Sequence, residues 1–153
     1  MTKWCEIARE NIHNRPKLAA GRMAGKICIV TGAAQGFGKG IAQELYNEGA
    51  TVVIADLNEP LAKQVAEEFG ERATAIAVNV SDEESVANMV AKTVEIYGGL
   101  DLMLSNAGVV RSGPIAQMER KDFDFVTNIN YTGYFLCAKY AAIIMQAEHE
   151  ADP

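Results

Sequence analysis

Along most of the chain, hydrophobic positions alternate between the spacing of buried strands and the spacing of amphipathic helices. Short apolar or β-branched runs at 26–31, 51–55, 73–78 and 100–105 predict four strands. Apolar residues at helical spacing predict three helices between them; these are 37–47, 59–69 and 81–97. The segment 122–148 contains few helix-breaking residues and predicts a short helix followed by a long one. Because strands that alternate with helices are typical of a parallel sheet, the pattern predicts an α/β fold.

Local signals refine the ends of the third helix and the fourth strand. Ser81 can cap this helix, while Glu84, three residues later, completes a reciprocal capping box. Gly98 and Gly99 then end the helix. The strand after them is apolar enough to be buried on both faces, and Asp101 at its start is interpreted as a solvated residue.

Residues 1–25 show a different pattern and are interpreted as a leader helix and linker, with 26–153 as the main domain. The leader carries apolar residues at helical spacing, namely Trp4, Ile7, Ala8 and Ile12, and Pro16 ends the pattern. This spacing predicts a short amphipathic helix that docks on the main domain. The alternative is a frayed terminus with no role.

Composition narrows the possible partners and compartments. The 153 residues suit one compact domain, and 14 Lys and Arg against 20 Asp and Glu give a net charge of −6. This acidic balance argues against nucleic acid, and no segment approaches the roughly 20 uninterrupted apolar residues of a membrane helix. Cys5, Cys28 and Cys137 form no Cys-x-x-Cys pair and favour a reducing cytoplasm. His13 and His149 are isolated, so no metal site is expected.

A glycine-rich loop comes directly after the first predicted strand. It reads TGAAQGFG from Thr31, with the spacing Gly-x-x-x-Gly-x-Gly. Glycines allow a sharp turn and a close approach to a pyrophosphate, and the next helix points its free N–H groups at that charge. The residues of this loop that we expect to bind a cofactor are Gly32, Gln35, Gly36, Phe37 and Gly38.

This loop, taken with the sequence Ser105-Asn106-Ala107-Gly108 after the fourth strand, resembles the short-chain dehydrogenase/reductase family. Members of the family also carry an acidic residue after the second strand and an asparagine in a later helical segment, which correspond to Asp56 and Asn130. The resemblance implies a Rossmann-like, doubly wound parallel sheet, incomplete here, with strand order 3-2-1-4 and the later strands absent. It also implies hydride transfer between a nicotinamide cofactor and an alcohol or ketone.

Asp56 determines the expected choice of cofactor. It ends the second strand, where the adenosine ribose of a dinucleotide lies, and a carboxylate there accepts hydrogen bonds from both ribose hydroxyls. The same carboxylate would repel a 2′-phosphate, and neither Ala55, Leu57 nor Asn58 supplies a cation to offset the repulsion. The sequence therefore predicts NAD rather than NADP, with Leu57 beside the ribose.

Other expected contacts rest on the resemblance. Asn79 and Val80 come after the third strand, where the family usually has an aspartate that meets the adenine, and the asparagine keeps an acceptor oxygen. After the fourth strand, Ala107 and Gly108 are expected to approach the cofactor closely. For Asn106, bracing between strands and direct cofactor contact remain equal alternatives.

The same resemblance implies a catalytic role for Asn130, which would help to hold a water chain that leads to the catalytic lysine. This asparagine would act through its backbone carbonyl in a locally disturbed helix. The alternative is that Asn130 caps the amino terminus of a helix, a position that asparagine favours.

The family's catalytic tyrosine, lysine and serine are not found in this chain. None of the five tyrosines has a lysine four residues later, so no Tyr-x-x-x-Lys motif is present. We therefore expect the chain to be the cofactor-binding part of an enzyme, truncated after the long helix and inactive alone. The alternative is a non-catalytic dinucleotide-binding or regulatory module that is complete in 153 residues.

The long helix and the leader suggest a partner and a substrate class. Between 130 and 148, apolar residues cover more of the helix than one core-facing stripe requires; they are Phe135, Leu136, Ala138, Ala141, Ala142, Ile143 and Met145. In the family this region resembles a helix that packs against its counterpart, so a homo-oligomer is expected. The alternative is that the extra apolar face covers further strands within one chain. The leader and the overall pattern are similar to those of polyol and sugar-phosphate dehydrogenases.

Overall fold

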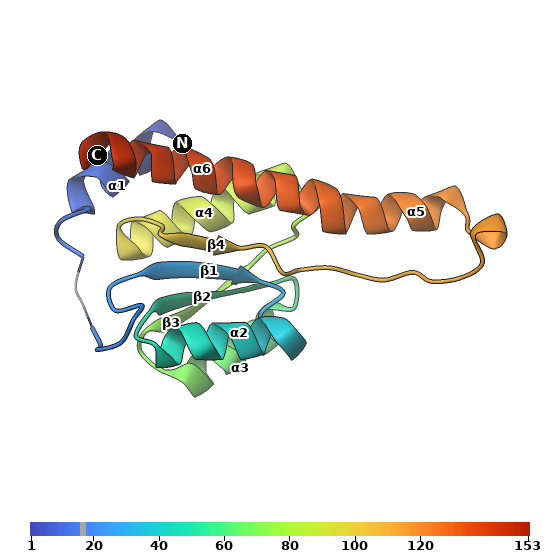
Figure 1. The fold of residues 1–153 in the computed structure, drawn as a ribbon, viewed down its shortest axis with the longest axis horizontal. Coiled ribbons are helices and arrows are strands. Elements are labelled where there is room, and N and C mark those ends of the chain that lie inside the picture. The colour runs from blue at the N-terminus through green and yellow to red at the C-terminus, as the bar shows by residue number, and fades with distance from the viewer. Residues whose placement is uncertain (16–17) are drawn as a thin grey trace.

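A computed structural model describes residues 1–15 and 18–153 and contains a four-stranded parallel sheet (Figure 1). The strands are β1 (Ile27–Thr31), β2 (Thr51–Asp56), β3 (Ala73–Ala77) and β4 (Leu102–Leu104). Their order across the sheet is β3-β2-β1-β4, and all three pairings are parallel. The α/β class and the strand order predicted from the sequence are confirmed.

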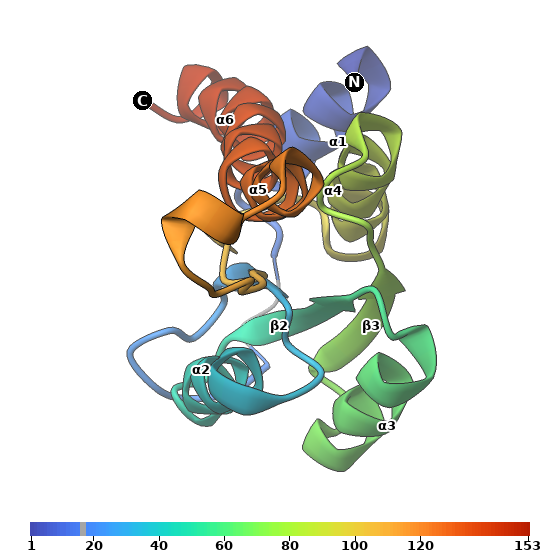
Figure 2. The same ribbon diagram turned by 90° about the vertical axis from the view of Figure 1, so that its right-hand side faces the viewer.

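Helices cover both faces of the sheet, as the end-on view in Figure 2 shows. On one face lie α2 (Gly36–Asn47) and α3 (Glu59–Phe69). On the other face lie α4 (Glu83–Tyr97), α6 (Gly133–Ala151) and α1 (Thr2–Asn11). Each strand therefore contributes apolar side chains to two separate cores.

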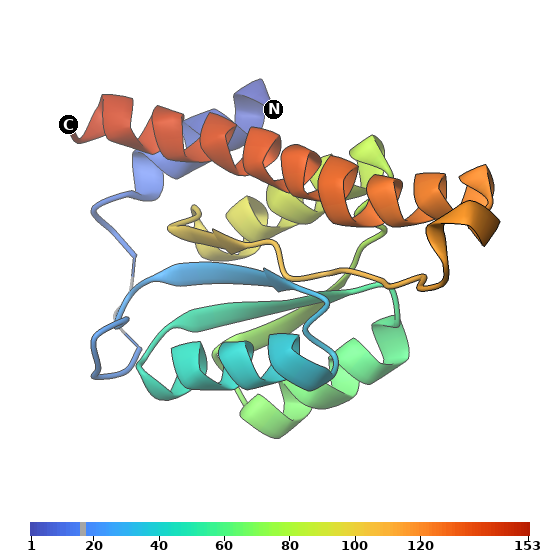
Figure 3. The ribbon, with the colours of Figure 1, turned by 45° about the vertical axis from the view of Figure 1, so that its right-hand side comes forward.

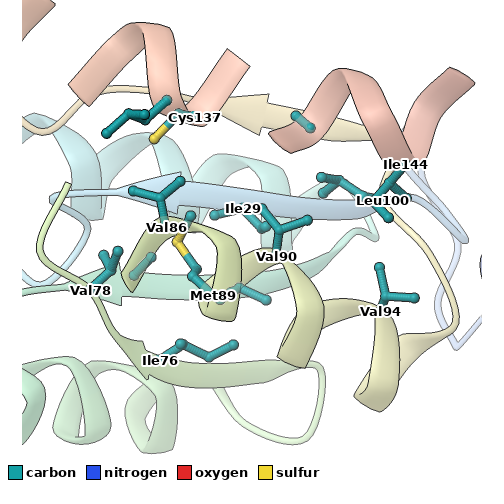
Figure 4. Close-up of a cluster of buried hydrophobic side chains, with 14 of the residues drawn as sticks. Ile29, Ile76, Val78, Val86, Met89, Val90, Val94, Leu100, Cys137 and Ile144 are labelled. Carbon is teal, nitrogen blue, oxygen red and sulfur yellow. The ribbon is translucent and has the colours of Figure 1, made fainter. Parts of the chain in front are cut away.

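The two central strands show this division residue by residue. Ile29 and Val53 belong to the core beneath α4 and α6, part of which Figure 4 draws, while Val30 and Ile54 belong to the core beneath α2 and α3. All four side chains are fully buried. Burial on both faces explains why these strands are continuous apolar runs instead of alternating patterns.

The fourth strand is shorter and more exposed than predicted. β4 pairs only with β1, so it lies at an edge of the sheet, and its three residues are half-buried. The prediction of a strand buried on both faces was therefore wrong here. The fully buried residue of this apolar run is Leu100, which precedes the strand.

The cap of α4 also differs from the prediction. The helix begins at Glu83, and Asp82 is its N-cap, with a side chain that accepts a hydrogen bond from the Ser85 amide at 3.0 Å. The Ser81 hydroxyl donates instead to Asn79 Oδ1 at 2.8 Å. The predicted capping box between Ser81 and Glu84 was therefore wrong, because the local turn at Asn79 engages the serine.

The leader helix is packed against the main domain. α1 contacts both α6 and α4, and Ala8 is fully buried between them. The docked helix is confirmed, and the alternative of a frayed terminus was wrong. The predicted stop at Pro16 lies outside the described residues.

The segment after β4 runs through a short 3₁₀ turn, Ile115–Gln117, into an almost continuous helical rod. The rod consists of α5 (Arg120–Thr127), a π-helical turn η2 (Asn128–Thr132) and α6. The short and long helices predicted for 122–148 are therefore present, joined by the π turn. None of the helices within 1–15 and 18–153 is both long and apolar enough to cross a bilayer.

Candidate functional site

A cavity of about 380 Å³ opens at the carboxyl ends of the strands. In an open α/β sheet this edge holds ligands, because helices close both faces and only the strand ends remain accessible. The lining residues are Gly32, Gln35, Phe37, Gly38, Asp56, Leu57, Val78, Asn79, Val80, Asn106, Ala107, Gly108, Val109 and Ile129. The structure thus brings together every predicted cofactor-binding residue except Gly36, and Asn130 lies outside the lining. Val78, Val109 and Ile129 were not predicted from the sequence.

The glycine-rich loop, residues 31–38, forms the wall of the cavity at the start of α2. Gly32 and Gly36 have φ values of 66° and 56°, the left-handed region that favours glycine. A Cβ atom on Gly38 would overlap the carbonyl oxygen of Gly32, so only glycine lets α2 start this close to the end of β1. α2 begins at Gly36, and no side chain caps its first turn. Its free N–H groups give this edge of the cavity a positive partial charge.

Asp56 connects the end of β2 to this loop. One carboxylate oxygen accepts a hydrogen bond from the Ala34 amide, and the other accepts one from the Asn58 amide, each at 3.0 Å. The residue is half-buried and lines the cavity, and each of its oxygens keeps accepting capacity beyond its one backbone hydrogen bond. No lysine or arginine is among the residues that line this cavity.

Two large apolar side chains stand at the mouth of the cavity. Phe37, in the first turn of α2, is 90% exposed, and Leu57, directly after β2, is 75% exposed. Exposed apolar side chains beside a cavity are typical of a surface that a ligand covers.

Asn79 uses its side-chain oxygen within the protein. Asn79 Oδ1 accepts hydrogen bonds from both the amide and the hydroxyl of Ser81, at 3.1 and 2.8 Å. Its backbone amide donates to Ser85 Oγ at 2.9 Å. The oxygen that was expected to meet an adenine is therefore already engaged, whereas Nδ2 takes part in none of these bonds.

Asn106 braces the two strand ends on either side of the cavity. Its Nδ2 donates to the carbonyl oxygen of Thr31 at 2.9 Å and to that of Gly32 at 3.4 Å. The Thr31 hydroxyl in turn accepts hydrogen bonds from the amides of Asn106 and Ala107, each at 3.1 Å. Of the two alternatives for Asn106, the geometry favours bracing. Thr31, fully buried, was missed as a site residue, although a polar residue that ends an apolar strand was a visible signal.

Asn130 lies in the π turn, where the helical hydrogen-bond ladder is disturbed. The Gly133 amide bonds to the carbonyl of Asn128, five residues back, as π geometry requires. The Asn130 side chain accepts from the Val109 amide at 2.8 Å and donates to the Val109 carbonyl at 2.9 Å. The alternative that Asn130 caps a helix was wrong, because helical residues continue on both sides of it.

Comparisons with known proteins find relatives of one family. The family described as short chain dehydrogenase matches residues 26–152. The chain is 42% identical to secoisolariciresinol dehydrogenase of Forsythia intermedia over 131 residues, which are 82% of this chain and 47% of that protein. It is 35% identical to sorbitol dehydrogenase of Cereibacter sphaeroides over 126 residues, 82% of this chain and 49% of that protein.

A solved structure is similar as well. It is the 3-ketoacyl-(acyl-carrier-protein) reductase of Brucella melitensis, complexed with NADH, with a TM-score of 0.73 and 34% identity. The match covers 75% of this chain and 48% of the reductase. This chain therefore spans about half the length of the relatives that it matches.

The close contact at Gly38 gives a testable prediction with a control on the same helix. Gly38→Ala should lower the free energy of unfolding by about 1–3 kcal/mol, because the added methyl group overlaps backbone. Gly40→Ala, with no atom within 4 Å of its new Cβ, should raise it by up to about 1 kcal/mol. Urea unfolding of both variants checks this, and equal effects would contradict the tight packing of the loop.

Proposed function

The chain belongs to the short-chain dehydrogenase/reductase family, and from this membership we propose that it is the NAD-binding part of an oxidoreductase. The whole enzyme would transfer hydride between NAD and an alcohol or ketone, a class that includes polyols and sugar phosphates. The observation that carries the proposal is the cavity at the strand ends, where glycines and a helix terminus lie beside Asp56, whose carboxylate bonds to the loop amide of Ala34.

The chemistry of the wall suits a dinucleotide. Gly32, Gly36 and Gly38 keep side chains away from the start of α2, so a pyrophosphate can approach its free N–H groups. Gln35 and Phe37 flank that approach. The exposed ring of Phe37 and the exposed methyl groups of Leu57 offer apolar cover to the flat parts of such a ligand.

Asp56 is the proposed selector of NAD over NADP. Each of its oxygens accepts one backbone hydrogen bond and keeps further capacity for ribose hydroxyls. A 2′-phosphate at the same place would bring a second negative charge next to this carboxylate. No lysine or arginine in the cavity lining would offset the repulsion, which supports NAD.

The other side of the cavity is proposed to hold the remaining parts of NAD. Val80 and Asn79 would lie beside the adenine, with Asn79 Nδ2 as the polar group that faces it because the side-chain oxygen bonds to Ser81. Ala107 and Gly108, after β4, would allow close approach of the cofactor. Asn106 would act indirectly, by holding the ends of β1 and β4 together.

The nicotinamide supplies the hydride chemistry when it is bound, and the residues of this chain bind and orient it. Asn130 is proposed to contribute through the π turn, where its side chain fixes Val109 and its backbone carbonyl would hold a water molecule. Proton transfer needs a tyrosine whose pKa a nearby lysine lowers, and no Tyr-x-x-x-Lys occurs in these 153 residues. We therefore propose that this chain alone is inactive. The same absence is equally compatible with the second candidate, a non-catalytic dinucleotide-binding module.

Association is proposed to use the exposed apolar flank of α6 beside the edge strand β4. Leu136 and Ala141 are buried in the core, and α1 covers another part of the helix, which was not expected from the sequence. An apolar flank nevertheless stays exposed, with Tyr134 at 59% and Phe135 at 55%, and with Ala138 and Ala142 further along the helix. This flank supports a homo-oligomer formed through the 130–148 helix.

A reducing compartment such as the cytoplasm is proposed for the protein. Cys28 and Cys137 are buried free thiols, and burial raises the pKa of Cys28 to about 12 and also raises that of Cys137. Both thiols therefore stay protonated near neutral pH, which makes them poor partners for disulfide exchange.

Cofactor choice is the first test. Titration calorimetry should show that NAD binds at least about tenfold more tightly than NADP, a difference of about 1.4 kcal/mol. Asp56→Ala should narrow this difference, whereas Asp152→Ala, at an exposed position far along the chain, should leave it unchanged. Equal affinities in the unmodified protein would remove Asp56 from its proposed role.

Turnover is the second test. The purified chain, given NAD and a panel of polyols and secondary alcohols, should form no NADH, because a lysine-tuned base is worth about 10²- to 10⁴-fold in rate. Steady NADH formation that disappears in Asp56→Ala would assign activity to this cavity and overturn the proposed inactivity. Formation that persists in the variant would point to a contaminating enzyme.

Oligomeric state is the third test. Light scattering at micromolar concentration should show a dimer or larger species, and Ala142→Glu should dissociate it by placing a charge on the apolar flank. Gln64→Glu, exposed on α3 at the opposite face of the sheet, serves as a control for added charge. A monomer at high concentration, unaffected by either change, would leave α6 with intramolecular contacts only.

A further inference from the structure

Residues 1–15 precede the region that matches the family, yet the structure fits them closely to it. α1 lies beside the carboxyl-terminal half of α6, as Figures 1 and 3 show, and Trp4, Cys5 and Ile7 pack against the core that α4 and α6 share. Two glycines of the main domain make room for the end of α1 and for Arg15. A Cβ atom on Gly98 would lie 2.8 Å from the Asn11 Cβ, and one on Gly99 would overlap the guanidinium of Arg15.

Arg15 enters the space beside Gly99 and is almost completely buried there, with 9% of its side chain exposed. Its Nη2 donates to Glu148 Oε1 and to the Gly98 carbonyl, and its Nη1 donates to Asp101 Oδ2 at 3.2 Å. One guanidinium thus connects the leader to the carboxyl-terminal part of α6 and to the start of β4.

The two carboxylates have further partners on the sheet. Glu148 accepts a hydrogen bond from the Leu100 amide at 2.9 Å. Asp101 accepts one from the Ile27 amide at 2.8 Å and one from Lys26 Nζ at 2.9 Å. The interpretation of Asp101 as a solvated residue was therefore wrong, because it joins the starts of β1 and β4 beneath Arg15.

The electrostatic balance of this cluster depends on Arg15. Glu148 has 9% of its side chain exposed, and burial raises its pKa, as does the nearby charge of Asp101. The Leu100 amide and Arg15 act in the opposite direction and favour the charged form. Lys26 is 53% exposed and bonds to Asp101, not to Glu148. Without Arg15, Glu148 would be a buried charge that faces another carboxylate.

We propose that residues 1–15 form an intramolecular strap, in which Arg15 is the positioning residue that seats the carboxyl-terminal half of α6 on the sheet. The strap acts at the amino-terminal edge of the strands, opposite the cavity. The helical rod is thereby fixed at two places: Asn130 bonds to Val109 at the cavity end, and Glu148 bonds to Arg15 and Leu100 at the far end. This inference does not depend on the identity of the cofactor.

The experiment compares two arginines of the full-length chain. Arg15→Ala should raise the equilibrium constant for unfolding in urea by at least about 100-fold, because removal of one partner leaves a buried charge unpaired. Arg22→Ala removes an exposed pair with Glu48, in which 84% of the arginine side chain is accessible, and should change the constant less than about fivefold. Glu148→Gln, added to Arg15→Ala, should recover most of the loss because it removes the unpaired charge.

Two further readouts separate positioning of α6 from general destabilisation. Amide hydrogen exchange in Arg15→Ala should accelerate most at Leu100 and at residues 141–151, and less in β1 and β2. The loss of folding stability that Arg15→Ala causes should also be larger at pH 8 than at pH 5. A carboxyl with a raised folded-state pKa stabilises the fold when protonated, and this contribution is lost as pH rises through that pKa.

The surrounding charges define how the pH comparison is interpreted. Arg15, Asp101 and Lys26 face the cluster, and Tyr97 of α4 lines the small cavity beside Arg15. The nearby pairs Arg9–Glu150 and His13–Asp152 are exposed, and Glu148→Gln leaves them intact. Adding Glu148→Gln to Arg15→Ala should therefore abolish the additional loss of stability at pH 8.

Equal effects of Arg15→Ala and Arg22→Ala, uniform acceleration of exchange, or a double variant that is no more stable than Arg15→Ala would each overturn the proposal. Failure of both Arg15→Ala and the double variant to fold, while Arg22→Ala folds, would do the same.

Discussion

Burial of the parallel sheet on both faces is the constraint on which the other features depend. The central strands β1 and β2 give their apolar side chains to two separate cores, so polar groups can gather only where the strands begin and end. At the carboxyl ends this produces the cavity with Asp56 and Asn106. At the amino ends it produces the cluster of Arg15, Asp101 and Glu148.

The two edges satisfy their polar groups in different ways. At the carboxyl edge, uncharged or singly charged groups bond mainly to backbone: Asn106 to Thr31, and Asp56 to Ala34. This leaves donors and acceptors of the loop and of α2 directed at the cavity, which is what a ligand requires. At the amino edge, buried opposite charges bond to one another, and the space is closed by a segment from outside the family match. One edge is arranged for binding and the other for holding elements together.

The sequence predicted the fold and most of the cavity because those features have local signals. Strand runs, the glycine spacing and the position of Asp56 each depend on neighbouring residues, and they sufficed for the α/β class and for the glycine-rich wall of the cavity. The family resemblance supplied the strand order and the lining residues after β3 and β4. Contacts between distant segments had no such signal. Arg15 meets Glu148 across 133 positions of sequence, and Asn130 meets Val109 across 21, so neither bond could be derived from a pattern. The prediction of the α4 cap failed for a different reason. Ser81 and Asp82 are both good caps, and only the turn at Asn79 selects between them.

The cavity at the carboxyl ends of the strands is the proposed binding site for NAD. The most direct measurement is an NMR titration of the isotope-labelled chain with NAD, with the amide signals assigned. If NAD binds there, the largest shifts should fall on the loop amides of residues 32–38, on Asp56 and Leu57, and on residues 106–108, while Leu100 and residues 141–151 change little. Shifts centred on the amino-terminal edge, or an unchanged spectrum at millimolar NAD, would contradict it.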